Sequence, residues 1–232
     1  GVAIADSSAG LYAALGILVA LAERERSGEG QWVTTSLLAA QIAMLDFQAA
    51  RYLVDGEVPP QAGNDHPYVT PTGAFETADG YINIGLGGPK QWKVFCETLR
   101  RPDLADHPDY ATQNLRFKHR PALNAELAKA FKSKSAKAWS QELEAVGVPA
   151  GPIYHMDEVF ADPQVQHLGM AAPVHHHARG DIRIVAEPVA LSRTPAQIDT
   201  PIAELGEHTD AVLAELGYAP EEIKKLRAQR VI

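Results

Sequence analysis

Several residue types that would mark a function class are scarce in this chain. Its 232 residues include one cysteine, Cys96, and aromatic residues make up only 7%. A single thiol forms neither an internal disulfide nor a thiolate metal cluster, so we expect a reducing, cytoplasmic setting and no metal. The low aromatic content also argues against stacking platforms for single-stranded nucleic acid.

Positive charge is also in short supply. Lys and Arg number 21 against 29 Asp and Glu, which gives a formal net charge of −8. Such a surface has no broad attraction for nucleic acid or anionic lipid, so we expect neither partner. The longest apolar run, residues 9–22, is short for a bilayer and suits a buried core helix, so we expect no membrane span. The first residues carry no leader pattern, and we expect the chain to be part of a longer polypeptide.

What is present is an ordinary globular composition, 46% hydrophobic and 22% charged, enough for one large or two small domains. Hydrophobic periodicity and capping residues predict alternating helices and strands. Strands are expected at residues 1–5, 31–35, 73–76, 81–86 and 181–185. Helices are expected at 11–22, 37–54, 90–99, 120–131, 135–146, 163–168, 209–216 and 220–230. The 11–22 helix is apolar all round and should be buried on most sides.

Changes in composition along the chain also predict its domains. Residues 1–62 and 166–232 should form one layer from both chain ends, and residues 63–165 a central α+β module. The boundary near residue 63 lies in a long stretch rich in glycine and proline, which is typical of a linker or a functional loop.

Asp6 is the residue that physical chemistry singles out. It stands between a predicted strand and a predicted helix, where helix amides and the macrodipole favour a charged carboxylate. Such a carboxylate can serve as a nucleophile or a general base, although an ordinary helix cap has the same pattern.

Other motifs are less specific. The loop Gly63-Asn64-Asp65-His66-Pro67 can approach a ligand closely or simply turn the chain. His175-His176-His177 cannot direct three imidazoles at one metal ion from a strand, so we expect an exposed run without function. Cys96 lacks an activating neighbour and should be inert, and Trp92 and Trp139 should lie in a core.

Taken together, the motifs closely resemble the class III CoA-transferases of the CaiB/BaiF type. The resemblance runs nearly end to end, in order and without large gaps. It is carried by residues 6–11, 16–18, 24–31, 36–38, 63–67, 78–80, 147–152 and 205–210.

The resemblance implies an α/β fold: part of a Rossmann-like large domain plus a smaller α+β domain, in an interlocked homodimer. Asp6 falls at the catalytic aspartate, which attacks an acyl-CoA thioester and passes through anhydride and aspartyl-CoA intermediates. Leu37 matches a position that lines the CoA site. Gly63, Asn64 and His66 belong to a mobile loop over the active site. Coenzyme A and acyl-CoA are then substrates exchanged with a carboxylic acid, and no permanently bound cofactor is expected.

Two alternatives stay open. The related α-methylacyl-CoA racemases carry a glutamate where this chain has Gly88, which disfavours a racemase. The chain could also be a catalytically incompetent fragment or an interaction domain, because its apolar helix would lack cover without a further segment.

Overall fold

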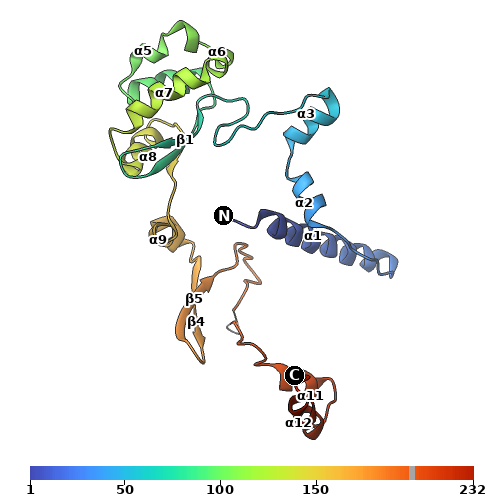
Figure 1. Cartoon of the computed structure of the whole chain (residues 1–232). Helices are drawn as coiled ribbons and strands as arrows, with labels where there is room; N and C mark the ends of the chain where they lie inside the picture. The colour runs from blue at the N-terminus through green and yellow to red at the C-terminus, as the bar shows by residue number, and fades with distance from the viewer. Residues whose placement is uncertain (199–201) are drawn as a thin grey trace.

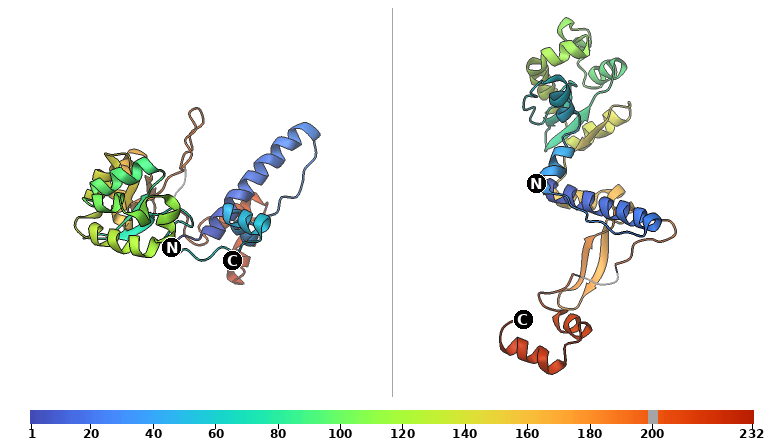
Figure 2. Two further views of the ribbon diagram at one scale, coloured as in Figure 1. Left: turned by 90° about the horizontal axis from the view of Figure 1, so that it is seen from above. Right: turned by 90° about the vertical axis from the view of Figure 1, so that its right-hand side faces the viewer.

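The computed structural model describes residues 1–198 and 202–232. The chain is elongated, with a central module at one end and a pair of C-terminal helices at the other (Figure 1). A long N-terminal helix and a β-hairpin lie between these two parts, and the side view shows the same order (Figure 2).

The N-terminal part consists of three helices: α1 (Ile4–Ser27), α2 (Leu37–Ala43) and α3 (Phe47–Asp55). Gly28 ends α1 in a left-handed conformation, and the Ser36 side chain caps α2 by accepting the Ala39 N–H. The single helix predicted over 37–54 is instead divided by a turn at residues 44–46, where Asp46 has a φ of 48°.

Both strands predicted in this part are wrong. Helix α1 already includes residues 4 and 5, and residues 31–35 form no strand. An isolated strand is unstable without a hydrogen-bonded neighbour, and among the described residues neither segment has one. Alanine and isoleucine at the start of α1 then extend the helix at little cost.

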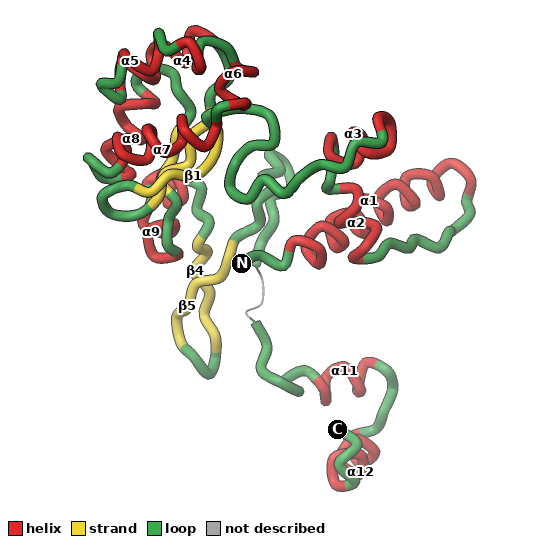
Figure 3. The backbone as a smooth tube through the Cα atoms, turned by 45° about the horizontal axis from the view of Figure 1, so that its top comes forward, coloured by secondary structure: helices red, strands yellow, loops and turns green. Residues whose placement is uncertain are grey.

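The prediction that the apolar helix is buried on most sides is also wrong for this chain. Ser8 and Ala9 are the residues of α1 that are buried, whereas Leu11 is 73% and Leu18 64% exposed. Its described neighbours are α2, which lies beside it in Figure 3, and Val33, which lies against Gly16. By length and composition alone α1 could cross a membrane, a test that core helices of soluble proteins also pass.

The central module contains a three-stranded antiparallel sheet in the order β1-β2-β3. Strands β1 (Thr72–Glu76) and β2 (Tyr81–Gly85) form the predicted hairpin, and the short β3 (Ala150–Pro152) pairs with β2. The module also contains six helical segments: α4 (Pro89–Thr98), α5 (Pro102–Ala105), the 3-10 helix η1 (Pro108–Tyr110), α6 (Gln113–Lys118), α7 (Arg120–Phe131) and α8 (Ala136–Glu144). Of these, α7 and α8 pack directly on the strands.

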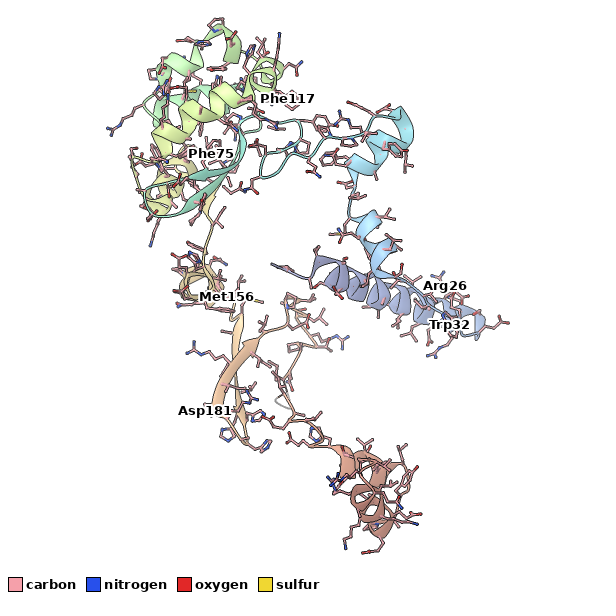
Figure 4. All side chains as sticks on the ribbon, viewed as in Figure 1. Arg26, Trp32, Phe75, Phe117, Met156 and Asp181 are labelled. Atoms are coloured by element: carbon pink, nitrogen blue, oxygen red, sulfur yellow. The ribbon has the colours of Figure 1, made fainter. Side chains whose placement is uncertain are left out.

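One hydrophobic core holds this module together. The side chains of β1 and β2 that point toward the helices are Phe75, Ile82 and Ile84. Phe131 of α7 stands 5.2 Å from the Phe75 ring and 5.5 Å from the Trp139 ring. The predictions that Trp92 and Trp139 lie in a core are confirmed, and Figure 4 shows Phe75 on the sheet.

The C-terminal part is built from small elements. They are α9 (Met156–Ala161), α10 (Pro163–His167), the hairpin strands β4 (Ala171–His176) and β5 (Gly180–Val185), α11 (Thr209–Glu215) and α12 (Pro220–Ala228). The histidine run lies where this hairpin turns. His175 and His177 are exposed as predicted, but the prediction is wrong for His176, which is 1% exposed. Its Nδ1 accepts the N–H groups of Ala178 and Arg179, so the imidazole supplies the hydrogen-bond acceptor for two backbone donors of the turn.

Candidate functional site

Asp6 lies in the first turn of α1, as the third helical residue, with Ala3 in the cap position. Its side chain is exposed, and no side chain caps this helix end. The helix N-terminus carries unpaired N–H groups and a partial positive charge, which is favourable beside a carboxylate. Asp6 is therefore not the helix cap that the sequence suggested, but an accessible carboxylate next to backbone donors.

Leu37 is the first residue of α2, and its side chain is half exposed. Because α2 packs on α1, Leu37 and Asp6 lie on neighbouring helices. Both belong to the N-terminal part of the chain.

The loop that contains Gly63, Asn64 and His66 belongs instead to the central module. The His66 N–H donates to the Thr72 carbonyl over 2.9 Å, and Asp65 forms an isolated antiparallel bridge with Gly73. A Cβ on Gly73 would lie 2.6 Å from the Asn64 carbonyl oxygen, so only glycine allows the loop to lie this close to β1.

Two arginines hold this loop in place through hydrogen bonds to Thr70 and His66. The buried Arg116 donates to the Thr70 carbonyl over 3.0 Å and to the Tyr110 carbonyl over 2.9 Å. Arg120 donates to the Thr70 hydroxyl over 2.8 Å and to the His66 carbonyl over 2.6 Å. Burial lowers the pKa of the Arg116 guanidinium, because desolvation disfavours its charge.

Amide side chains complete the attachment. Gln113 donates to the Tyr68 carbonyl over 3.0 Å, and Asn124 donates to Asp65 over 3.2 Å. Sequence reasoning missed these residues and both arginines. The spacing of four between Arg120 and Asn124 places both on one side of α7, but Arg116 lies on the separate helix α6, so no periodic pattern joins the three.

An aromatic cluster joins the loop to α3. The Phe47 ring stacks on the His66 imidazole with 6.2 Å between centroids and lies 6.0 Å from the Tyr68 ring. Arg51 places its guanidinium 5.0 Å from the centre of the Tyr68 ring. This cluster is the point where the N-terminal helices meet the central module.

Asp6 and the loop are not brought together within this chain. None of the hydrogen bonds, ion pairs or aromatic contacts found in residues 1–198 and 202–232 joins α1 to residues 63–71. The loop is held to its own module by hydrogen bonds from His66, Arg116 and Arg120.

The described residues form no site suited to metal binding or thiol chemistry. In the part of the chain that the structure describes, no group of three or more His, Cys, Asp and Glu side chains is placed to hold a metal ion. Cys96 is buried in the core, and desolvation raises the pKa of its thiol to about 12, which is consistent with an inert cysteine.

Comparison with known proteins identifies the family of this chain. The chain matches CoA-transferase family III over residues 1–209. It is 35% identical over 233 residues to the succinyl-CoA:glutarate CoA-transferase of Homo sapiens, covering all of this chain and 53% of that relative. The chain belongs to CoA-transferase family III. The family resemblance seen in the sequence motifs is thereby confirmed.

Other members of CoA-transferase family III agree. The succinate–glutarate CoA-transferase of Agrobacterium fabrum is 37% identical over 220 residues, which are 93% of this chain and 54% of the relative. The crystal structure of a CAIB/BAIF family protein from Brucella suis superposes with a TM-score of 0.79 at 35% identity, covering 93% of this chain and 56% of that one. The mixed α/β fold is thus the family III fold. The chain spans about half the length of the curated relatives it matches.

Proposed function

We propose that this chain functions as part of a CoA-transferase that moves CoA from an acyl-CoA to a carboxylic acid. The observation that carries the proposal is family membership over residues 1–209, together with relatives named as CoA-transferases. We infer that short dicarboxylic acids are the substrate class, because the human and Agrobacterium relatives are named for succinate and glutarate. Coenzyme A is then a substrate and not a resident cofactor.

In the proposed mechanism Asp6 is the nucleophile. Its carboxylate attacks the thioester carbonyl, the carbon–sulfur bond breaks, and an acyl-aspartyl anhydride and CoA thiolate result. The thiolate attacks the aspartyl carbonyl, which releases the first acid and leaves an aspartyl-CoA thioester. The acceptor carboxylate attacks that thioester, its carbon–sulfur bond breaks, and a second anhydride and CoA thiolate result. The thiolate then attacks the acceptor's acyl carbonyl, which forms the new acyl-CoA and releases the Asp6 carboxylate. The exposed position of Asp6 at a helix start supports this role, since backbone N–H groups there can stabilise developing negative charge.

We also infer that the complete protein is a homodimer in which protein covers α1. The exposed leucines of that helix support this, because soluble proteins rarely leave so large an apolar face in water. Because Asp6 and the loop lie on separate parts of one chain, a site containing both requires a contribution from a second subunit or a movement of the two parts. Analytical ultracentrifugation of the full-length protein without detergent tests the dimer, and sedimentation as a monomer would contradict it.

The mechanism is tested by replacing Asp6. We expect Asp6→Asn in the full-length protein to abolish CoA exchange between succinyl-CoA and glutarate, because an amide is too weak a nucleophile. Glu25→Gln, an exposed carboxylate later on the same helix, is the matched control and should retain activity. Hydroxylamine added with succinyl-CoA should convert Asp6 of the wild type to a hydroxamate, seen by mass spectrometry. Retained exchange in Asp6→Asn would refute the mechanism, and α-proton exchange without acyl transfer would indicate a racemase.

A further inference from the structure

The His66 ring is held in one orientation by its own loop. Its Nδ1 accepts two backbone N–H groups, from Tyr68 over 3.1 Å and from Val69 over 3.0 Å. A nitrogen that accepts hydrogen bonds has no proton, so the proton of the neutral ring lies on Nε2. His66 is therefore a hydrogen-bond donor at Nε2 and is not available there as a base.

The surroundings fix this donor in space. Phe47 stacks on the ring, and Arg120 binds the carbonyl of the same residue. Among the described residues the hydrogen bonds of the His66 ring are both at Nδ1, and Nε2 has no partner. A half-buried, oriented donor without a partner is suited to a ligand oxygen.

The local charge favours an anion. Three arginines, at positions 51, 116 and 120, lie around the loop, against Glu57 and Asp65. Arg51 pairs with Glu57, and Arg120 lies 4.0 Å from Asp65, whereas Arg116 has no carboxylate partner in residues 1–198 and 202–232. Arg116 is therefore a positive charge without an ion-pair partner among the described residues, and it is hydrogen-bonded to the Thr70 carbonyl of the loop.

We propose that the His66 Nε2–H donates to a carboxylate oxygen of the acid substrate, and that His66 serves as a fixed donor and not as an acid–base residue. The proposal rests on the proposed function for the identity of the ligand. The position of the ring proton, however, follows from the turn alone. His176 provides an internal reference, because its Nδ1 accepts two backbone N–H groups in the same pattern.

The first test is spectroscopic and does not need activity. In the ¹⁵N-histidine-labelled full-length protein at pH 7.5, we expect His66 and His176 both to show the Nε2–H tautomer. Glutarate should shift the His66 Nε2 resonance and leave that of His176 in place. A proton on Nδ1 of His66, or no shift at saturating glutarate, would overturn the proposal.

The second test separates the two ring nitrogens by mutation. His66→Asn keeps an acceptor near the Nδ1 position but removes the Nε2 donor, whereas His66→Gln keeps a donor near Nε2. We expect His66→Asn to raise the KM for glutarate about 10- to 100-fold, as for a lost hydrogen bond to a charged group, and His66→Gln to recover part of that loss. His107→Asn is the matched control, because His107 Nδ1 also accepts a backbone N–H, from Asp109, and activity should not change.

The outcomes distinguish this proposal from the proposed function. If His66→Asn shows an unchanged KM for glutarate, the donor role is wrong even though transfer occurs. If the wild type transfers no CoA and forms no Asp6 adduct, the proposed function fails, and the glutarate titration alone then decides the role of His66.

Discussion

At the residue scale, the loop depends on a buried charge. Arg116 is 3% exposed and lies with its guanidinium 4.8 Å from the centre of the Trp92 ring. A buried charge is costly unless its hydrogen-bond donors are used, and Arg116 uses three of them on Thr70, Tyr110 and Gln113. The cost is offset by the carbonyl groups that it satisfies, which holds the end of the loop in place.

Cys96 gives a prediction with a defined pH dependence. Burial raises the pKa of its thiol from 9.0 to about 12. The unfolded thiol ionises first as pH rises, so the contribution of Cys96 to stability is present below pH 9 and lost between pH 9 and about 12. We expect native protein at pH 8.5 to leave Cys96 unmodified by iodoacetamide, and urea-unfolded protein to be alkylated, as measured by mass spectrometry. Rapid alkylation of the native protein would contradict the buried position.

At the element scale, the attachment of the loop to β1 depends on Gly73. Its φ is 154°, and a Cβ there would meet the Asn64 carbonyl oxygen at 2.6 Å. We expect Gly73→Ala to destabilise the protein by about 2 kcal/mol or more in urea unfolding, since backbone has to move. Gly80→Ala, in the turn of the same hairpin, meets nothing within 4 Å and should change stability by less than about 0.5 kcal/mol. Equal effects of the two substitutions would show that the close approach is unimportant.

Elements with local signals were the ones that the sequence predicted well. The hairpin of β1 and β2 has alternating residues on both sides of a tight turn, and α8 begins after the capping Ser135. Residues 31–35 have the same alternation but form no strand, because strand formation needs a partner that the pattern cannot supply.

The candidate site was predictable in its parts but not in its arrangement. The sequence motifs drew attention to Asp6 and His66, and the structure puts Asp6 in the first turn of α1 and His66 in the loop before β1, while their roles stay predictions. The clamp by Arg116 and Arg120 could not be foreseen, because it joins residues about 50 positions apart mainly through the backbone carbonyls of Thr70 and His66, which carry no sequence signal.

At the scale of the whole molecule, the parts differ in how self-sufficient they are. The large core cluster extends from Phe75 to Val148 and lies entirely in the central module. The N-terminal helices bury little and expose several leucines. The central module encloses a core of its own, whereas the N-terminal helices of this chain leave their apolar side chains exposed.

This contrast predicts how fragments behave. We expect residues 62–154 made alone to unfold in one cooperative urea transition followed by tryptophan fluorescence, because both core tryptophans and their partners are included. Residues 1–62 made alone should show no cooperative transition, since they enclose no core. A fragment 62–154 without a cooperative transition would mean that the module depends on the rest of the chain.

The contiguity of that core also bears on the order of events during synthesis. A ribosome releases the stretch from Phe75 to Val148 as one uninterrupted piece, so this module can close while later residues are still being added. Helix α1 precedes this module in the sequence, and its leucines stay exposed in this chain after the module has closed. A chain in which this module has folded therefore still carries an apolar surface on α1, to which a chaperone can bind.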